Sequence, residues 1–262
     1  MKLWEPIKIK RDKDHYWQIG PLKIWLKKIK DEWLIAYEQS PHDPESTDIT
    51  IAEVREKPDT VTWNRYVCES PDSIQLLPVL QDRAVVVGSE MPVKILPGNS
   101  ALFVVRIPVW VHLYAGEKKE TMLTEIPTVP LSNTWFGDPM TGELCYSLTT
   151  MARRSIEETD NNPHRAICPV RIKNSSKGSL DFQKLSIHVE HLKVYAGKET
   201  LWTNEVKITF FGEDQPNRID FADKKPDLEK DCILLSKERT PVDRSLLKKS
   251  VSFFKYFTSF ES

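Results

Sequence analysis

Two histidines and a glutamate form the most compact group of titratable side chains in the sequence: His188, Glu190 and His191. Imidazole and carboxylate groups serve as general acids and bases and as metal ligands. On a strand, His188 and Glu190 share a face, while His191 points to the other side unless a bulge intervenes. We can assign no third ligand from another element, so we interpret the three as surface residues of a strand. We predict no metal site and no catalytic residue there.

A second candidate is the turn-rich segment that begins at Gly137 and ends at Glu143, here called the 137–143 loop. Its carboxylates, Asp138 and Glu143, could lie close together, as a hydrolase or a cation site requires. However, Asp before Pro139 and Glu after Gly142 are also typical of a tight surface turn. The turn is the favoured interpretation, and an enzyme or a small-ligand or cation-binding protein with its site at this loop is the alternative.

Basic residues gather in a third region, around Arg153, Arg154, His164 and Arg165. Such a group could bind an anion, but the acidic residues of the same connection neutralise much of its charge, which favours a solvated loop. No G-x-S-x-G motif surrounds a serine, and no glycine-rich loop precedes a helix. The sequence therefore gives no support for a serine hydrolase, a nucleotide-binding protein or a cofactor.

Composition limits the classes of partner and compartment. Among 262 residues, 37 Lys and Arg nearly balance 38 Asp and Glu, so no overall field attracts nucleic acid or an acidic membrane. The four cysteines are widely spaced without a C-x-x-C pair, as expected of reduced thiols in the cytoplasm. No signal peptide and no run of about twenty apolar residues is present. We expect a soluble cytoplasmic protein with at most peripheral membrane contact.

The elements that would position these residues are predominantly strands. Leu22, Ile24 and Leu26 alternate with polar or amphipathic residues, the period of a half-buried strand. Residues 97–98 are Pro and Gly, which fit a type II turn between two further strands. Pro108 interrupts the apolar run of residues 102–114, so we expect that strand to be an edge strand, or to be bulged or broken at the proline. The chain is predicted to be all-β.

A weak internal repeat suggests how the strands are grouped. Residues 111–125 and 192–205 each contain a strand, Tyr-Ala-Gly, a charged turn and a second strand. The spacing of about eighty residues is that of one small β-sandwich, although two hairpins can also be similar by chance. We predict two tandem immunoglobulin-like β-sandwich domains at residues 1–130 and 131–222. Residues 223–262 would form a polar connection and a C-terminal amphipathic helix.

The predicted C-terminal helix covers residues 246–257, and its apolar stripe includes Leu247, Val251, Phe254 and Phe257. It could pack on its own domain, dock into a partner protein or lie on a membrane, although a few lysines make a weak membrane anchor. Trp135 and Phe136 could similarly be core residues or an anchor for a partner.

Three stretches of the sequence resemble a known family: residues 106–111, 134–146 and 168–174. They look like an uncharacterised prokaryotic family known only as a domain of unknown function, whose members are often encoded beside small-conductance mechanosensitive channels. The resemblance brings no catalytic residues. It implies a soluble protein that works near a membrane channel.

The sequence thus favours a non-enzymatic protein-interaction module, an accessory of a membrane channel. The expected partner-binding residues are those of the C-terminal helix stripe together with Trp135 and Phe136.

Overall fold

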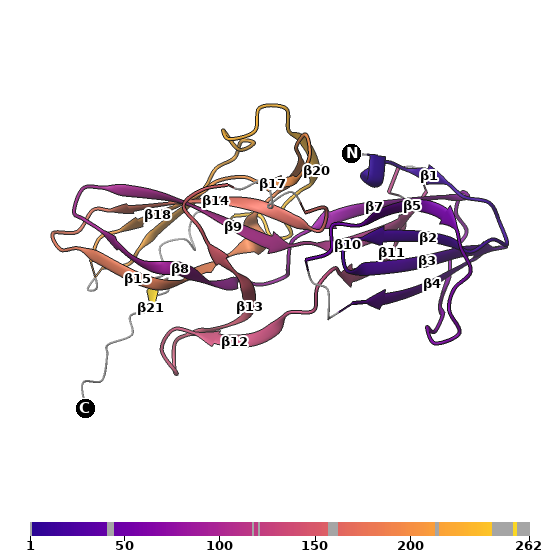
Figure 1. Ribbon diagram of the computed structural model, residues 1–262, viewed down its shortest axis with the longest axis horizontal. Coiled ribbons are helices and arrows are strands. Elements are labelled where there is room, and N and C mark those ends of the chain that lie inside the picture. The colour runs from indigo at the N-terminus through magenta and orange to yellow at the C-terminus, as the bar shows by residue number, and fades with distance from the viewer. Residues whose placement is uncertain are drawn as a thin grey trace.

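Strands dominate the computed structural model of the chain, which describes residues 2–40, 45–116, 118–119, 121–156, 162–212, 215–242 and 254–255 (Figure 1). Among the described residues, two short 3-10 helices accompany them, η1 (Lys2–Trp4) and η3 (Val189–His191). The prediction of an all-β protein is confirmed. The strands are β1 (Ile7–Lys8), β2 (His15–Ile19), β3 (Leu22–Ile29), β4 (Glu32–Gln39), β5 (Ile49–Val54), β6 (Asn64–Val67), β7 (Ser73–Val79), β8 (Val85–Ile95), β9 (Ser100–Pro108), β10 (Trp110–Ala115), β11 (Thr121–Pro127), β12 (Ser132–Phe136), β13 (Glu143–Ala152), β14 (Arg165–Asn174), β15 (Leu180–Ile187), β16 (Val194–Ala196), β17 (Leu201–Thr203), β18 (Val206–Phe210), β19 (Arg218–Phe221), β20 (Ile233–Ser236) and β21 (Phe254–Lys255).

These strands form four sheets in an elongated molecule (Figure 1). At one end lie a sheet of order β1-β7-β10-β11 and a sheet of order β5-β2-β3-β4-β6. Towards the other end lie a sheet of order β12-β13-β8-β15-β21 and a larger sheet of order β19-β18-β14-β17-β16-β20, in which β9 also pairs with β14.

The sheets do not divide the chain at residue 130, where the sequence predicts a domain boundary. Strands β8 and β9 precede that residue, yet β8 pairs with β13 and β15, and β9 pairs with β14. The chain then returns to the first group of sheets through β10 and β11 before it enters β12. Pairing between strands distant in sequence decides this grouping, and the sequence pattern carries no information about it.

The alternation predicted in β3 is confirmed. Leu22, Ile24 and Leu26 are fully buried in the main hydrophobic cluster, whereas Trp25 packs on the opposite face against Tyr16 and Ala36. Burial of each such side chain contributes about 1.5–3 kcal/mol. Both faces of this sheet are therefore partly covered, which explains why a large aromatic residue occupies the outward-facing position.

Apolar packing joins the four sheets. One cluster contains Trp17 from β2, Leu113 from β10, Val87 from β8 and Val170 from β14, each at most 1% exposed. The two groups of sheets therefore share a continuous core, so their relative position is fixed by side-chain packing as well as by the linking strands.

Turn chemistry also agrees with the sequence. Strand β9 ends at Pro108 and β10 begins at Trp110, so the run is broken at the proline as predicted. Gly98 has a φ of 76° in the turn between β8 and β9. Each half of the predicted repeat is an antiparallel hairpin, formed by β10 with β11 and by β16 with β17.

The predicted C-terminal helix is not confirmed. Leu247, Val251 and Phe257 lie outside the described residues, and the two residues described in this segment form strand β21 beside β15. In the part of the chain that the structure describes, no helix is long and apolar enough to cross a membrane.

Two glycines with positive φ, Gly20 and Gly98, differ in the space around their Cα atoms. Gly20 has a φ of 58°, and a Cβ at this position would overlap His164 Nδ1 and lie 2.8 Å from the Ser46 carbonyl oxygen. Gly98 has a similar φ but open space around it. Gly98→Ala should lower the free energy of unfolding by about 1 kcal/mol, the cost of the left-handed conformation. Gly20→Ala should lower it by about 3 kcal/mol, because a steric overlap is added.

Urea denaturation of both variants measures the difference. Equal losses would show that the contact with His164 does not constrain the turn.

Candidate functional site

The 137–143 loop is a closed turn at the tip of the β12–β13 hairpin. The Asp138 carbonyl accepts hydrogen bonds from Trp135 Nε1 (3.0 Å) and from the Gly142 backbone N–H (2.7 Å). The Asp138 carboxylate accepts one from the Met140 N–H (2.8 Å). A Cβ on Gly142 would lie 2.5 Å from the Phe136 carbonyl oxygen, so only glycine fits. The turn interpretation is therefore confirmed, with Asp138 bonded to its own loop.

Glu143 faces a different set of groups. Its Oε1 accepts a hydrogen bond from Ser186 Oγ (3.0 Å) and lies 3.5 Å from His188 Nε2. Strand β8 separates β13 from β15, but its first residue, Val85, is level with Tyr146 and Ile187. Glu143 precedes Tyr146 and His188 follows Ile187, so both residues lie past the first residue of β8. Strand β8 therefore does not separate their side chains. The fold thus brings together two candidates that are 45 residues apart in the sequence, which the sequence did not predict.

The histidine cluster is a 3-10 turn, so its interpretation as a strand was wrong. Strand β15 ends at Ile187 and η3 follows at once. His188 Nδ1 is 2.9 Å from Glu190 Oε1, and His191 Nε2 is 3.8 Å from the same oxygen. The side chains are only 14–20% exposed. The two-residue period of a strand does not apply in a 3-10 turn, and all three side chains can therefore meet.

His188 holds a proton more strongly than a free histidine. Burial acts to lower its pKa, but the hydrogen bond to Glu190 and the negative charges of Glu190 and Glu143 outweigh it, so the pKa is raised. The His188 imidazole therefore lies between two carboxylates that favour its protonated form.

The thiol beside this cluster lies in surroundings that disfavour the nucleophilic thiolate form. Cys145 Sγ lies 3.9 Å from Ser186 Oγ, and burial together with the charge of Glu143 raises the thiol pKa to about 12. A thiol with that pKa is almost wholly protonated near neutral pH. Across the described residues, no group of three or more His, Cys, Asp or Glu side chains is arranged so that it could hold a metal ion.

The histidine turn also forms hydrogen bonds with the segment of residues 232–242, here called the C-terminal strap. His191 Nδ1 is 2.7 Å from the Thr240 carbonyl oxygen, and the Thr240 N–H donates to the Glu190 carbonyl (3.0 Å). The neighbouring Arg239 donates to Glu125 (2.7 Å) and lies 5.3 Å from the centre of the Trp110 ring. The strap therefore ties the histidine turn to the first group of sheets.

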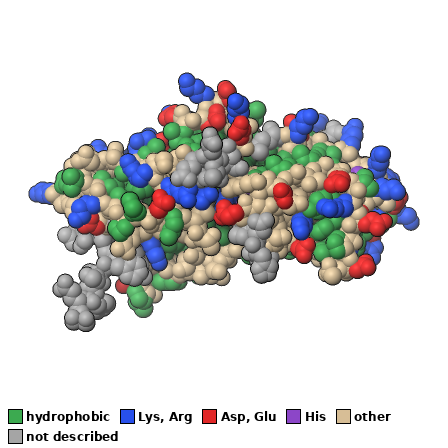
Figure 2. Space-filling model, in the orientation of Figure 1, with side chains coloured by type: hydrophobic (Ala, Val, Ile, Leu, Met, Phe, Trp, Pro, Cys, Tyr) green, Lys and Arg blue, Asp and Glu red, His purple; other side chains and the backbone are tan. Residues whose placement is uncertain are grey.

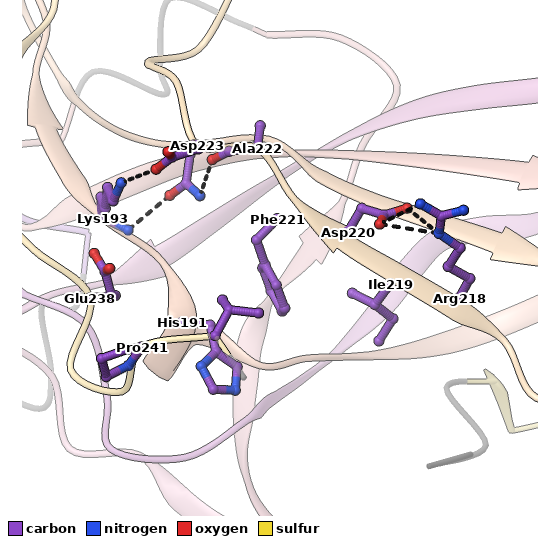
Figure 3. Close-up of a pocket in the computed structure, with 12 residues that line it drawn as sticks. His191, Lys193, Arg218, Ile219, Asp220, Phe221, Ala222, Asp223, Glu238 and Pro241 are labelled. Carbon is purple, nitrogen blue, oxygen red and sulfur yellow. Dashed lines mark hydrogen bonds and ion pairs between the residues drawn. The ribbon is translucent and has the colours of Figure 1, made fainter. Parts of the chain in front are cut away.

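A cleft of about 720 Å³ opens beside His191 (Figure 3). Lys193, Phe221 and Glu238 also line it, and the His191 and Phe221 rings are 5.3 Å apart. Lys193 forms an ion pair with Asp223, and Arg218 with Asp220 (2.9 Å). Because its two basic side chains are paired with neighbouring carboxylates, the cleft has no concentrated charge of one sign with which to select a ligand.

The predicted partner-binding residues are separated by the structure. Trp135 is 49% exposed, whereas Phe136 is 2% exposed and packs with Ala84, Val86 and Cys145. Neighbouring residues of a strand face opposite sides, so only Trp135 is available to a partner. Phe254 is in β21, and the binding role of the C-terminal residues stays a prediction.

The basic region around Arg165 is not a solvated loop, which corrects the prediction. Arg165 is 1% exposed and forms an ion pair with Glu45, and His164 is completely buried. The hydrogen bond from Arg165 lowers the pKa of Glu45 despite the opposing effect of burial, and the charge of Arg106 adds to it. Glu45 is 120 residues away in the sequence, so no local signal could have identified this pair.

Comparison with protein families identifies the family of the chain. The family model described as "Protein of unknown function (DUF432)" matches residues 3–255. No curated protein matches the chain, and no solved structure matches it.

Stability should depend on pH through His188. A folded-state pKa above the unfolded value of about 6.5 means that protonation favours the folded state. This contribution is complete below the unfolded pKa and is lost as the pH rises through the folded pKa. His188→Gln should therefore lower the free energy of unfolding more at pH 5.5 than at pH 9. Chemical denaturation at the two pH values measures the loss, and equal losses would contradict the assignment.

Glu190→Gln provides the matched test, because it keeps the shape of the partner and removes its charge. This variant should show the same pH-dependent loss while His188 is still present.

Proposed function

We propose that this chain, which belongs to the uncharacterised DUF432 family because the family model spans residues 3–255, is a non-enzymatic protein-interaction module. We propose further that it is a cytoplasmic accessory of a membrane channel and is held at the membrane through that partner. The resemblance to a family encoded beside mechanosensitive channels supports this choice of partner.

The observation that carries the proposal is an exposed apolar group, here called the hairpin-tip surface, formed by Trp135, Met140 and Leu144. These side chains are 49%, 89% and 48% exposed. Trp135 and Leu144 are directly opposite in the β12–β13 register, so their side chains share one face. An aromatic residue with flanking Met and Leu is the composition typical of a protein-binding centre.

The hairpin-tip surface is also preorganised. The indole N–H of Trp135 is bonded to the Asp138 carbonyl, and the same carbonyl accepts the Gly142 N–H. A side chain already held in one position loses less conformational entropy on binding. This supports recognition by a rigid hairpin.

The polar groups near the loop support binding more than catalysis. The carboxylates of Asp138 and Glu143 bond to different groups, the first to its own turn and the second to Ser186. A ligand or cation site at the 137–143 loop would need both carboxylates to converge. That alternative therefore has less support than the interaction role.

Charge distribution supports a protein partner over nucleic acid. Lys, Arg, Asp and Glu side chains are interspersed on the face shown in Figure 2. The formal net charge of the whole chain is −1. A phosphate backbone is recognised by concentrated positive charge.

The finer architecture we propose is a pair of immunoglobulin-like β-sandwiches. Its support is the burial of Trp17 and Leu113, from the two sheets of the first group, in one cluster. Val87 and Val170, from the two sheets of the second group, are buried in the same cluster. Such alternating inward residues are expected of two sheets packed face to face.

Substitution of the hairpin-tip surface tests the proposal. The full-length chain would be used to capture proteins from detergent-solubilised membranes of the native host, with identification by mass spectrometry. Leu144→Ser should reduce capture of the channel about fivefold, the effect of losing about 1 kcal/mol of binding. Trp135→Ser should reduce it by more than tenfold, because buried aromatic anchors contribute most to binding.

Val54→Ser is the matched control, since Val54 is 59% exposed but lies on β5 in another sheet. Trp135→Ser also removes a hydrogen bond of the turn, whereas the Leu144 side chain takes no part in the turn hydrogen bonds described above. Leu144→Ser therefore tests the surface without changing the loop. Equal capture by Leu144→Ser and Val54→Ser would contradict the proposal that the hairpin-tip surface binds the partner. Failure to capture a channel would contradict the proposal that the partner is a channel.

A further inference from the structure

Charged groups of both signs line the cleft of about 720 Å³, so their pairing decides what the cleft can bind (Figure 3). The described lining includes three carboxylates and two basic side chains. Arg218 is paired with Asp220, and Lys193 with Asp223. The third carboxylate, Glu238, takes part in none of the ion pairs between described residues. The basic side chains of the cleft therefore leave one negative charge without a partner.

The surroundings of Glu238 make this charge unfavourable in the free chain. The side chain is only partly exposed, and its Oε2 is buried without a hydrogen-bond partner among the described residues. Buried carboxylate oxygens normally accept a hydrogen bond. The pKa of Lys193 is raised mainly by its hydrogen bond to Asp223 and further by the charge of Glu238. Lys193 is thus within electrostatic range of Glu238, but its ammonium group is bonded elsewhere.

The C-terminal strap holds Glu238 in place. The next residue, Arg239, donates a hydrogen bond to Glu125 (2.7 Å). The backbone N–H of Thr240 donates to the Glu190 carbonyl (3.0 Å). Because the two residues after Glu238 are anchored, its carboxylate is already positioned at the cleft before any ligand binds. Such preorganisation lowers the entropic cost of binding.

The same cleft has an aromatic and apolar surface. The Phe221 and His191 rings lie 5.3 Å apart, and Pro241 adds apolar surface beside them (Figure 3). Asn204 Nδ2 donates to the Ala222 carbonyl (2.7 Å), which fixes the chain directly after Phe221. The face of a phenyl ring attracts cations as well as apolar groups. The volume is within the range of pockets that bind small molecules.

We propose that this cleft binds a small organic ammonium ion, a protonated primary amine with an aromatic or alkyl body. The ammonium group pairs with Glu238, and the body packs against Phe221 and Pro241. The charge of a carboxylate is shared by both its oxygens, so the ligand compensates Glu238 without contact to the buried Oε2. The cleft and the hairpin-tip surface share no residue, and the inference goes beyond the interaction role.

The arrangement disfavours an anionic ligand. A carboxylate or phosphate group would have to displace Asp223 from Lys193 and would then lie within range of the Glu238 charge. Like charges brought together at a binding site reduce affinity. The charge of Glu238 would also stay without a partner. A cation is therefore the better match.

Three probes of similar shape separate charge from packing: 2-phenylethylammonium, 2-phenylethanol and phenylacetate. Nuclear magnetic resonance titration of the full-length chain near neutral pH measures their affinities. The ammonium probe should bind about tenfold more tightly than the alcohol, because hydrogen bonds between charged groups are the stronger ones. Phenylacetate should bind most weakly. Equal affinity for the ammonium probe and the alcohol, or no saturable binding of the ammonium probe at millimolar concentration, would overturn the proposal.

Glu238→Gln tests the assigned carboxylate, because it keeps the side-chain shape and removes the charge. The ammonium probe should bind about tenfold more weakly to this variant, while the affinity for the alcohol stays the same. Glu229→Gln is the matched control, since Glu229 is also partly exposed but does not line the cleft. An equal loss in the two variants would show that net charge alone matters and would reject the assignment.

Lys193→Met tests the sign of the ligand charge. Loss of the lysine removes a positive charge that repels a bound cation, so the ammonium probe should bind about threefold more tightly. A site for anions would instead bind the ammonium probe no better and would lose affinity for phenylacetate. This variant also keeps the proposal testable if Glu238→Gln disturbs the strap, and unchanged or weaker binding of the ammonium probe would contradict it.

Discussion

The pairing of β9 with β14 is the interaction on which the arrangement of the molecule depends. Nine consecutive register pairs join Ser100 to Lys173 at one end and Pro108 to Arg165 at the other. Inward residues of both strands, such as Val105 and Val170, belong to the main hydrophobic cluster. The pair brings a strand from the first part of the chain into the largest sheet of the second part.

This pairing also determines what meets between the two groups of sheets. Where β14 begins, His164 lies against Gly20 and Arg165 reaches Glu45. Buried charges of this kind are tolerated only when they are paired, so a displacement of β14 would leave Arg165 without compensation. On the other side, Arg239 of the C-terminal strap reaches Glu125 and Trp110. The relative position of the two groups is thus coupled to polar as well as apolar contacts.

One sheet positions both the hairpin-tip surface and the histidine turn. The third sheet carries the hairpin-tip surface at its β12 edge, and the histidine turn directly follows β15 in the same sheet. His191 and Glu190 hold the C-terminal strap through Thr240. The charge on His188 and the attachment of the strap therefore involve adjacent residues of one turn.

The sequence by itself determined the local structure. Alternation at Leu22, Ile24 and Leu26, the turn at Gly98 and the break at Pro108 follow from backbone geometry and side-chain period, which act over a few residues. Only the tertiary structure decided that Glu143 meets His188 and that Arg165 is buried beside Glu45. These contacts depend on strand order and register between distant segments. Packing of the complete chain selects that order, and no local pattern encodes it.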